Sequence, residues 1–303
     1  MKYIFVINGS PSKTEIRQAV ERQLEELKAK IAERNDTTSV YISTGVGDAT
    51  RYVRIYNDLH QKEHVCFVAC GGSGTINEVA SGIVGFQNKE LAIFTGNHVC
   101  DVIRYYPDRK FDSISEIMDS PVKKIDIIKV NDNYCLNMCN IGLDARIAYN
   151  VNVLTANNVK DPYKKAIRRG LLVGRYNYVK VVADGKQIGH NLLTLCTFAN
   201  GKYIGDGMLG APRSVNDDGL IDICYLKPMS LLRLIISMKF YREGRHFDTK
   251  FISNKFLYRR ARKIQVYSPK ILDICLDGEM SLGSSLDIEI LPNELPLRLP
   301  KIK

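Results

Sequence analysis

The first 130 residues alternate short apolar runs with longer amphipathic segments. Apolar or β-branched residues dominate five short runs, at positions 3–8, 38–43, 65–70, 91–94 and 123–130. Apolar residues recur at helical spacing in the longer segments, at about 14–34, 48–61 and 75–84. Alternating strands and helices predict a doubly wound parallel sheet, whose ligand loops lie at the carboxyl ends of the strands. We therefore predict an α/β domain over residues 1–122.

After Pro121 the pattern becomes that of antiparallel strands. Two pairs of strand-like runs flank short turns, 123–130 with 134–140 and 178–183 with 187–197, the second around Asp184-Gly185-Lys186. Further short strands are expected near 220–226, 263–267, 271–276 and 285–291, and helices near 144–155, 161–173 and 229–242. This pattern predicts an antiparallel β-sandwich domain over residues 123–294. The closing stretch, 295–303, is expected to return to the first domain.

One loop in the first domain carries candidate chemistry. The apolar run that ends at Cys70 stops in Gly71-Gly72-Ser73-Gly74, and a helical pattern begins at Thr75. Glycines let backbone N–H groups approach an anion, and the positive end of a helix dipole favours a phosphate. Neither known fingerprint fits, because a dinucleotide loop needs glycine where Asn77 stands and a P-loop needs a lysine. From this segment alone, a phosphate loop and an ordinary tight turn both remain open.

Composition indicates an ordinary globular protein of about two domains. The chain has 303 residues, of which 45% are hydrophobic and 25% charged. The longest apolar stretches fall well short of the ~20 residues of a membrane span, and the N-terminal apolar region is too short for a signal peptide. Seven of the eight cysteines lie in apolar runs: Cys66, Cys70, Cys135, Cys139, Cys196, Cys224 and Cys275. They predict reduced core thiols and a cytoplasmic protein.

The positive charge is confined to the second part of the chain. Residues 1–125 contain 16 Lys and Arg against 16 Asp and Glu, whereas residues 126–303 contain 27 against 17, so the whole net charge of +10 lies there. Two basic clusters contribute most of it: Lys160, Lys164, Lys165, Arg168, Arg169 and Arg175, and then Arg242, Arg245, Lys250, Lys255, Arg259, Arg260, Arg262 and Lys263. Such clusters suit an anionic membrane surface, a nucleic acid or simple solvation.

Four segments, in order, resemble the diacylglycerol kinase catalytic family, which includes bacterial lipid kinases and sphingosine and ceramide kinases. The Gly71–Thr75 loop is similar to the family's Gly-Gly-Asp-Gly-Thr signature, and the stretch 199–208 to its Asn-Gly…Gly-Gly-Gly-Met loop. Ala211-Pro212 with residues 216–222 resembles the Asp-Gly-Leu-Leu-Asp segment, and Asp277-Gly278-Glu279 the Asp-Gly-Glu segment. The resemblance spans nearly the whole chain.

The resemblance implies a lipid kinase that uses ATP and Mg²⁺ to phosphorylate a lipid hydroxyl, of diacylglycerol or a related lipid. A lipid substrate favours an anionic membrane surface over nucleic acid as the partner of the basic clusters, and a cytoplasmic, peripherally membrane-associated protein. A nicotinamide-dinucleotide kinase shares the glycine loop but is disfavoured by the segments 200–208 and 277–279. The acceptor lipid, the nucleotide preference and the oligomeric state stay open, a homodimer among the states allowed.

On the acceptor side, the resemblance assigns Glu279 as the proton acceptor and places Asp277 in the metal and water network. Carboxylates this close raise one another's pKa toward a useful range. A solvent-facing turn is the other interpretation of Asp-Gly-Glu. A second Mg²⁺ site is implied at the Asp218 carboxylate and the backbone carbonyls of Val215 and Leu220, oxygen ligands that suit a hard cation. An ordinary turn before the next strand is nearly as good an interpretation there.

The nucleotide side is implied to contain residues of four segments: Asn8, Gly9, Ser10, Ser43, Thr44, Gly71, Gly72, Ser73, Gly74, Thr75, Asn77, Glu78, His98 and Asp101. Thr44 with Asp48 and Ala49 resembles the family's Thr…Gly-Asp-Ala stretch, in which a hydroxyl contacts the nucleotide. Single hydroxyls are common in loops, so this assignment depends on the resemblance.

Three nucleotide-side motifs depart from the family pattern. Ser73 stands where the family has aspartate, Asn8-Gly9-Ser10-Pro11-Ser12 replaces Asn-Pro-x-x-Gly, and 97–100 (Asn-His-Val-Cys) replaces Gly-Thr-Gly-Asn ahead of Asp101. Losing a group that orients a metal typically costs ~10–100-fold. The departures favour a second hypothesis, a catalytically impaired relative that binds lipid or nucleotide.

His60-Gln61-Lys62-Glu63-His64 matches the His-x-x-Glu-His spacing of a zinc helix. No third ligand accompanies it, and no Cys-x-x-Cys pair occurs in the chain. We predict a solvated helix terminus rather than a zinc site.

Overall fold

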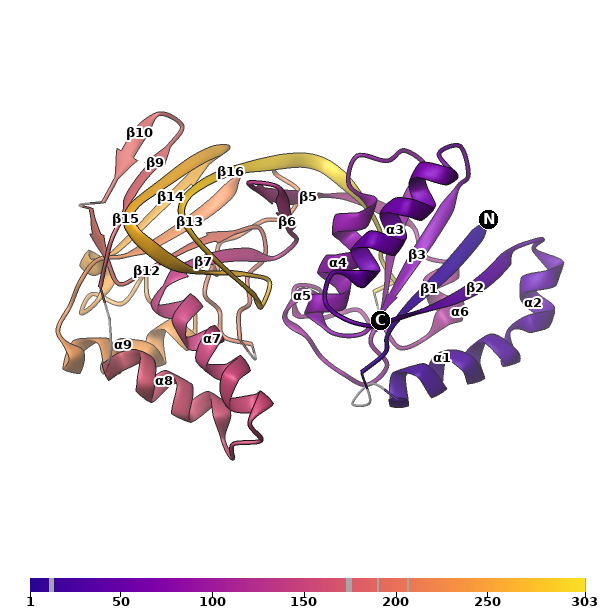
Figure 1. Cartoon of the computed structure of the whole chain (residues 1–303), viewed down its shortest axis with the longest axis horizontal. Helices are drawn as coiled ribbons and strands as arrows, with labels where there is room; N and C mark the ends of the chain where they lie inside the picture. Colours follow the sequence, from indigo (N-terminus) through magenta and orange to yellow (C-terminus); the bar gives the residue numbers. More distant parts are fainter. Residues whose placement is uncertain (11–13, 173–175, 190, 206, 303) are drawn as a thin grey trace. The chain divides into compact units, whose positions relative to one another are not determined.

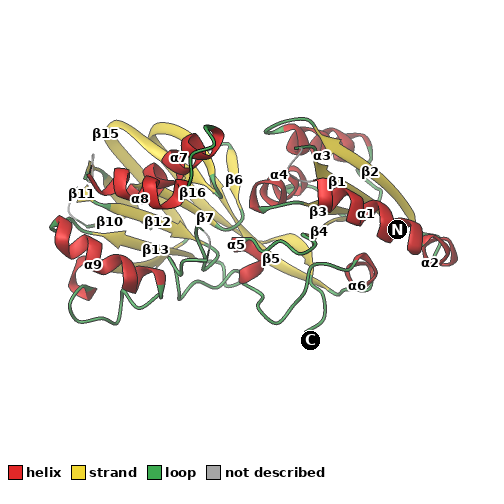
Figure 2. Ribbon diagram, turned by 90° about the horizontal axis from the view of Figure 1, so that it is seen from below, coloured by secondary structure: helices red, strands yellow, loops and turns green. Residues whose placement is uncertain are grey.

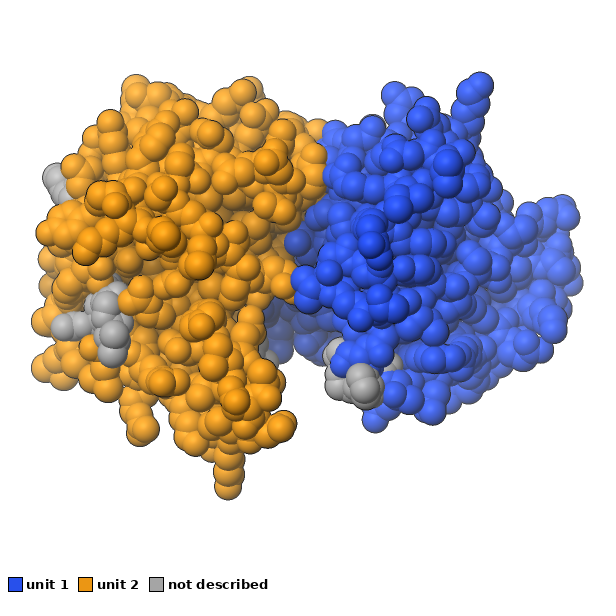
Figure 3. All heavy atoms as spheres, viewed as in Figure 1, with its two compact units in different colours: residues 1–125, 293–303 blue, residues 126–292 orange. Residues whose placement is uncertain are grey.

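A computed structural model describes residues 1–10, 14–172, 176–189, 191–205 and 207–302. The chain divides into two compact units, unit 1 with Met1–Ile125 and Asn293–Lys303, and unit 2 with Asp126–Pro292 (Figure 3). Three residues named above, Pro11, Ser12 and Arg175, lie outside the described residues, as does Asp206 of the stretch 199–208.

The sheet of unit 1 is parallel, as the alternating pattern predicts. Its strands run in the order β4 (Lys89–Phe94), β3 (Val65–Cys70), β1 (Lys2–Asn8) and β2 (Thr37–Ser43). The far end of β16 (Glu279–Arg298) adds a further parallel strand, because Leu297 pairs with Leu91. The apolar runs form strands because helices cover both faces of the sheet, so every residue of β3 is buried.

Helices flank this sheet on both sides (Figure 1). Helices α1 (Thr14–Glu26), α2 (Lys28–Glu33) and α6 (Ile114–Met118) share one apolar cluster with the odd-numbered residues of β1. Helix α4 (Ser73–Ile83) packs on β1, β3 and β4, and α3 (Asp48–Leu59) packs on α4. A single turn, α5 (Asp101–Arg104), follows β4. The short helices α5 and α6 were not predicted, because four or five residues are too few to establish a helical period.

Unit 2 is the predicted antiparallel sandwich. One layer contains β14 (Phe256–Ala261), β13 (Ile221–Leu226), β12 (Leu195–Ala199) and β7 (Met138–Gly142), beside the second half of β15 (Lys263–Leu276). The other contains β10 (Lys186–Ile188), β9 (Lys180–Ala183), the first half of β15, β16, β5 (Val122–Val130) and β6 (Asn133–Cys135). The register of β15 on β16 shifts between Tyr267 and Leu272, where β15 passes from one layer to the other.

A single apolar core fills the sandwich, with alternate residues of each strand facing it. Cys196 and Phe198 of β12 point into this core, whereas Leu195 points out and joins a second cluster under three helices. These helices are α7 (Leu143–Ala156), α8 (Pro162–Leu172) and α9 (Leu231–Arg242), and Figure 2 shows them on the sheet of β7, β12 and β13. A 3₁₀ turn (Ser253–Lys255) precedes β14, and β8 (Asn177–Tyr178) pairs with β11 (Leu192–Leu193).

Two features of unit 2 differ from the sequence prediction. The two strands expected at 263–267 and 271–276 are one bent strand, β15, and the basic segment 256–261 is strand β14. Because β14 is a strand, Arg259 and Arg260 point toward opposite faces of the sheet. It is also an edge strand, with β13 as its one neighbour among the described residues.

The seven cysteines predicted to lie in the core are buried, and Cys100 is partly exposed. Across the described ranges, every helix is too short or too polar to cross a membrane.

Candidate functional site

The carboxyl ends of the strands of unit 1 bring the predicted nucleotide residues to one edge of the sheet. In the register of the sheet Asn8 lies opposite Ser43, and Ile7 lies opposite Cys70. The Gly9 N–H donates to the Ser43 carbonyl over 3.0 Å, and the Asn8 amide donates to the Thr75 hydroxyl over 3.3 Å. The loops after β1, β2 and β3 are therefore joined to one another.

The two leading glycines of the glycine loop have different reasons to be glycine. A Cβ on Gly71 would lie 2.5 Å from the Thr75 hydroxyl, so the turn itself excludes a side chain. A Cβ on Gly72 would meet nothing within 4 Å. Gly72 precedes the first turn of α4 in an extended conformation, and no side chain caps the helix there. Its backbone therefore faces open space at a helix N-terminus, which suits a phosphate.

A cavity of about 280 Å³ opens beside this edge. It is lined by Asn8, Gly9, Ser10, Thr14, Arg17, Gln18, Glu21 and Ile42. Sequence reasoning missed Arg17, which forms an ion pair of 2.8 Å with Glu21. The available signal was its place one turn into the helix that follows the Asn8–Ser10 loop.

Two carboxylates fix the loop after β2. Asp48 accepts hydrogen bonds from the Thr44 N–H (2.9 Å) and hydroxyl (3.1 Å) and pairs with Arg51 over 2.8 Å. The Thr44 N–H and then the Arg51 guanidinium hold the pKa of Asp48 well below its usual range. Glu78 accepts from the backbone N–H groups of Gly47 and Ala49 at the start of α3. Glu78 and the Thr44 hydroxyl thus have protein partners.

Two of the departures from the family pattern, Ser73 and Cys100, meet at the start of α4. Ser73 is the first residue of the helix, and its hydroxyl interacts with the Cys100 thiol. Burial raises the pKa of Cys100. Val99 points mostly into solvent, at 61% exposure, and the His98 ring lies 4.0 Å from the Glu15 carboxylate. Asp101 begins α5, with the Arg104 guanidinium 3.9 Å away.

In unit 2, Asp277 braces the turn between β6 and β7. Its carboxylate accepts hydrogen bonds from the N–H groups of Leu136 (2.6 Å), Asn137 (3.0 Å) and Met138 (2.8 Å) and from the Cys135 thiol (3.2 Å). Burial raises the pKa of Asp277, and these backbone donors oppose the rise. Both oxygens are occupied by the protein, so a role for Asp277 in a metal and water network stays a prediction.

Glu279 follows this brace directly. Asp277 and Gly278 both have positive φ, +50° and +98°, as a two-residue hairpin turn between β15 and β16 requires. Glu279 is the first residue of β16, lies opposite Leu276 and is exposed. The Asn152 amide of α7 donates to the Gly278 carbonyl over 3.3 Å. The turn that carries Glu279 is therefore tied to its surroundings on two sides.

The three predicted motifs of unit 2 are linked by hydrogen bonds. The Asn137 carbonyl accepts from the Asn200 and Gly201 N–H groups, and the Asn200 amide donates to the carbonyls of Asp126 (2.9 Å) and Leu136 (3.0 Å). The Asp126 carboxylate in turn accepts from the Gly219 N–H over 2.7 Å. The segments 199–208, 216–222 and 277–279 thus meet around Asp126 and Asn137, two positions that sequence reasoning did not single out.

The predicted Mg²⁺ ligand Asp218 already has a cationic partner. Its carboxylate pairs with Arg260 of β14 and also accepts from the Leu220 N–H over 3.1 Å. Among the residues that the structure describes, no three His, Cys, Asp or Glu side chains are grouped as metal ligands would be. As the side chains lie, a divalent cation at Val215, Asp218 and Leu220 would have to displace a guanidinium. These three residues do not fit the ion without that change, so the reaction proposed below uses no ion at this position.

Sequence reasoning also missed Asp144, a buried carboxylate under α9. The Tyr241 hydroxyl donates to it over 2.7 Å, and burial raises the pKa of Asp144 to about 6. The available signal was a single acidic residue inside the apolar stretch 141–145.

The His-x-x-Glu-His segment is not a helical zinc site. Helix α3 ends at Leu59, ahead of both histidines. His64 instead interacts with Glu90 over 2.7 Å, and Glu63 accepts from the Tyr56 hydroxyl over 2.6 Å.

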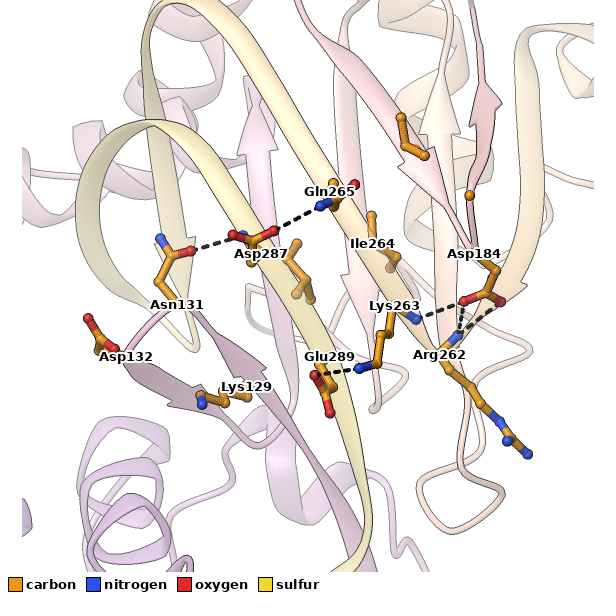
Figure 4. A pocket seen from close by; sticks show the side chains of 13 residues that line it. Lys129, Asn131, Asp132, Asp184, Arg262, Lys263, Ile264, Gln265, Asp287 and Glu289 are labelled. Atoms are coloured by element: carbon orange, nitrogen blue, oxygen red, sulfur yellow. Dashed lines mark hydrogen bonds and ion pairs between the residues drawn. The ribbon is translucent and has the colours of Figure 1, made fainter.

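A cavity of about 1010 Å³ in unit 2 is a basin whose lining contains none of the predicted site residues. Figure 4 shows two of its lining carboxylates held by protein groups: Glu289 pairs with Lys263 over 3.3 Å, and Asp184 accepts from the backbone N–H groups of Arg262 and Lys263. Four carboxylates and three basic side chains line it. We therefore do not assign a ligand to this basin.

Two family models together cover most of the sequence. Residues 2–130 match the diacylglycerol kinase catalytic domain, and residues 137–299 match the YegS C-terminal NAD kinase beta sandwich-like domain. The chain belongs to the diacylglycerol kinase catalytic-domain family, with a YegS-like C-terminal domain. The first model contains the glycine loop, as the resemblance implied.

Relatives extend the match over both units. A diacylglycerol kinase of Bacillus subtilis (strain 168) is 26% identical over 270 residues, which are 87% of this chain and 86% of the relative. This chain also matches a crystal structure of a diacylglycerol kinase from Bacillus anthracis str. Sterne, with a TM-score of 0.70 and 20% identity. The match covers 100% of this chain and 98% of the other. Another solved chain from that organism has a TM-score of 0.74 at 22% identity, over 100% of this chain and 96% of the other. These structures show a shared fold.

Proposed function

We propose that this protein is an ATP-dependent kinase of a lipid hydroxyl, that of diacylglycerol or a related lipid. The observation that carries the proposal is the Leu276–Glu279 turn. Asp277 fixes this turn to the backbone of residues 136–138, and the exposed Glu279 carboxylate follows it in a chain that belongs to the diacylglycerol kinase family. A carboxylate on a fixed turn is suited to proton abstraction from an acceptor hydroxyl.

In this proposal the phosphates of ATP lie at the start of α4. The open backbone at Gly72 and the N–H groups of Ser73 and Gly74 would donate to phosphate oxygens, and the helix dipole would favour their charge. Bound Mg²⁺ would supply further positive charge to the phosphates. Asn8, Ser10 and Arg17 line the adjoining cavity and would position the rest of the nucleotide.

The proposed reaction moves one phosphoryl group. The lipid hydroxyl oxygen forms a bond to the γ-phosphorus of ATP, and the bond from that phosphorus to the bridging oxygen breaks, which releases ADP. Glu279 takes the hydroxyl proton. Peripheral contact with an anionic membrane, which the positive charge of residues 126–303 favours, would bring the acceptor lipid to the enzyme.

The direct test is Glu279→Gln, assayed with radiolabelled ATP on mixed lipid vesicles. Because the amide keeps the shape but cannot accept the proton, phosphorylation should fall by about 10²–10⁴-fold. The melting temperature should stay that of the wild type, since Glu279 is exposed. Wild-type turnover by a folded Glu279→Gln protein would remove this residue from the mechanism.

Ser73 favours a second candidate function, a nucleotide- or lipid-binding protein that transfers phosphate poorly or not at all. No carboxylate is present at this first position of α4. If only a metal ligand is missing, Ser73→Asp should raise Mg²⁺-dependent turnover several-fold. The upper limit is the ~10–100-fold that such a group controls. No gain, with ATP binding retained, would support the non-catalytic candidate. A fall in turnover would show that Ser73 is not a defect.

A further inference from the structure

The first two turns of α9 expose three large apolar side chains on the outward face, although helices that cover a sheet normally turn polar side chains to water. Its buried stripe, Leu234, Ser237 and Tyr241, packs toward the sheet. On the opposite side Leu232 is 70% exposed, Ile235 50% and Ile236 43%. These residues are spaced i, i+3 and i+4, so they lie together on one face.

Phe251 extends this face beyond the helix. Its side chain is 48% exposed, and the Arg233 guanidinium lies 5.0 Å from its ring centroid. Arg233 also donates to the Phe251 carbonyl and, over 3.0 Å, to the Asn254 side chain, which joins the loop to α9. We call Leu232, Ile235, Ile236 and Phe251 the α9 ridge.

Basic side chains surround the ridge. The segment 227–255 contains seven Lys and Arg but only Glu243 and Asp248 as acids. Both acids are paired, Glu243 with Arg245 over 3.3 Å and Asp248 with Arg213 over 2.8 Å. Lys239, Arg242 and Lys250 are exposed. The segment therefore presents an excess of positive charge around an apolar centre.

The rest of the second basic cluster is less suited to an anionic surface. Arg260 is paired with Asp218, and Lys263 with Glu289. Arg262 and Lys263 also line the basin, where carboxylates outnumber basic side chains. Two of the basic side chains at 259–263 are therefore balanced by carboxylates, whereas Lys239, Arg242 and Lys250 around α9 have no ion pair among those that the structure describes.

We propose that the α9 ridge enters the headgroup region of a bilayer that contains anionic phospholipid, with Lys239, Arg242 and Lys250 binding lipid phosphates around it. This proposal rests on the proposed lipid kinase function, which requires a membrane substrate. An apolar stripe between basic residues is the pattern of an interfacial helix, because long basic side chains reach the phosphates while apolar ones enter the acyl boundary. Anionic phospholipid supplies both the apolar interior and the negative charge that this surface complements.

The chain contains no tryptophan, which allows a direct test. Ile236→Trp would introduce the sole indole, on the ridge. Its emission should shift to the blue on vesicles of phosphatidylglycerol and phosphatidylcholine, and acyl-chain-brominated lipids should quench it. Ile55→Trp is the matched control, because Ile55 lies on a helix of unit 1 and is 53% exposed, and it should not respond. Without lipid acceptor or ATP in the sample, the result is independent of kinase activity.

Sedimentation with the same vesicles gives the magnitude. The Ile235→Gln/Ile236→Gln variant should bind about 10-fold more weakly and Ile55→Gln as the wild type, because only the ridge loses apolar contact. Binding should also weaken between about 0.1 M and about 0.5 M NaCl.

An unshifted Ile236→Trp spectrum on these vesicles would overturn the proposal. So would a blue shift that appears without lipid as protein concentration rises, since a second copy would then cover the ridge. Insertion by a protein that phosphorylates no lipid would uphold this surface and count against the kinase.

Discussion

The two units hold their candidate functional groups by different physical means. In unit 1 the loop after β3 depends on backbone geometry, with Gly71 packed on Thr75 and the open backbone of Gly72 at a helix start. In unit 2 the turn before Glu279 depends on a buried carboxylate that accepts from three backbone N–H groups. A side chain can change in the first arrangement while the loop keeps its shape, but the second fails if Asp277 changes.

This difference accounts for where the chain departs from its family. Ser73 replaces an aspartate at a position whose side chain supports no other backbone segment in the structure. Asp277-Gly278-Glu279 keeps the family residues, because the carboxylate and the positive φ at Gly278 are each required by the turn. A side chain can therefore change at position 73 without loss of the local backbone structure, whereas a change at Asp277 removes the acceptor of three backbone N–H groups.

The largest effect that would sharpen the comparison is expected from Asp277→Ala. It leaves three N–H donors without an acceptor, each costing ~1–3 kcal/mol, so the free energy of unfolding should fall by about 3–5 kcal/mol. Ser73→Ala, the matched change in unit 1, should alter it by less than about 0.5 kcal/mol. Denaturant unfolding of both variants measures the difference. Equal losses would break the comparison.

A smaller effect concerns pH. Burial raises the pKa of Asp144 to about 6, so between pH ~4 and ~6 the folded state keeps a proton that the unfolded state has lost. Stability from this group is therefore present at low pH and is lost as pH rises through that window. The difference in unfolding free energy between the wild type and Asp144→Asn should change by about 2 kcal/mol over it.

Asp48 of unit 1 should show the opposite pH dependence of stability. Because its pKa is lowered in the folded state, the free energy of unfolding should fall as the pH drops below the usual pKa range of an aspartate. Unfolding curves recorded from pH 4 to 8 test Asp144. If the unfolding free energies of the wild type and Asp144→Asn change with pH by the same amount, burial does not raise the pKa of this carboxyl group.

The smallest effect is expected at the Arg260–Asp218 pair. Arg260→Gln should lower the free energy of unfolding by about 1 kcal/mol, because the pair is partly exposed. Arg259→Gln, the control one residue away, should leave it unchanged. We expect EDTA to leave the melting temperature of the wild type unchanged and Mg²⁺ to raise that of Arg260→Gln. If Mg²⁺ stabilises the wild type and Asp218→Asn abolishes this, the metal displaces the guanidinium and the predicted site at Val215, Asp218 and Leu220 stands.

Much of the fold could be predicted from the sequence, because the relevant signals are local. Apolar runs located the strands of unit 1, and Asp184-Gly185 located a hairpin turn in which both residues have positive φ. Strand β14 was missed because Arg259 and Arg260 of this edge strand read as part of a basic cluster.

The candidate site was less predictable, because its key contacts join distant segments. Leu136 and Asp277 are 141 positions apart, and the Arg260–Asp218 pair joins residues 42 positions apart. The motif showed which residues were present at 277–279. It could not show that Asp277 serves the backbone, or that a guanidinium already balances Asp218.

The last strand of unit 1 has a consequence for the order of synthesis. Strand β4 ends at Phe94, but its outer neighbour is the stretch around Leu297, which pairs with Leu91. During translation the outer edge of β4 therefore remains unpaired while some two hundred further residues, including all of unit 2, are made. An apolar strand edge left open is a template for pairing with another chain. The nascent protein thus passes through a stage in which its first domain is nearly complete but keeps an open strand edge that favours aggregation, and this stage lasts until the stretch around Leu297 has been made.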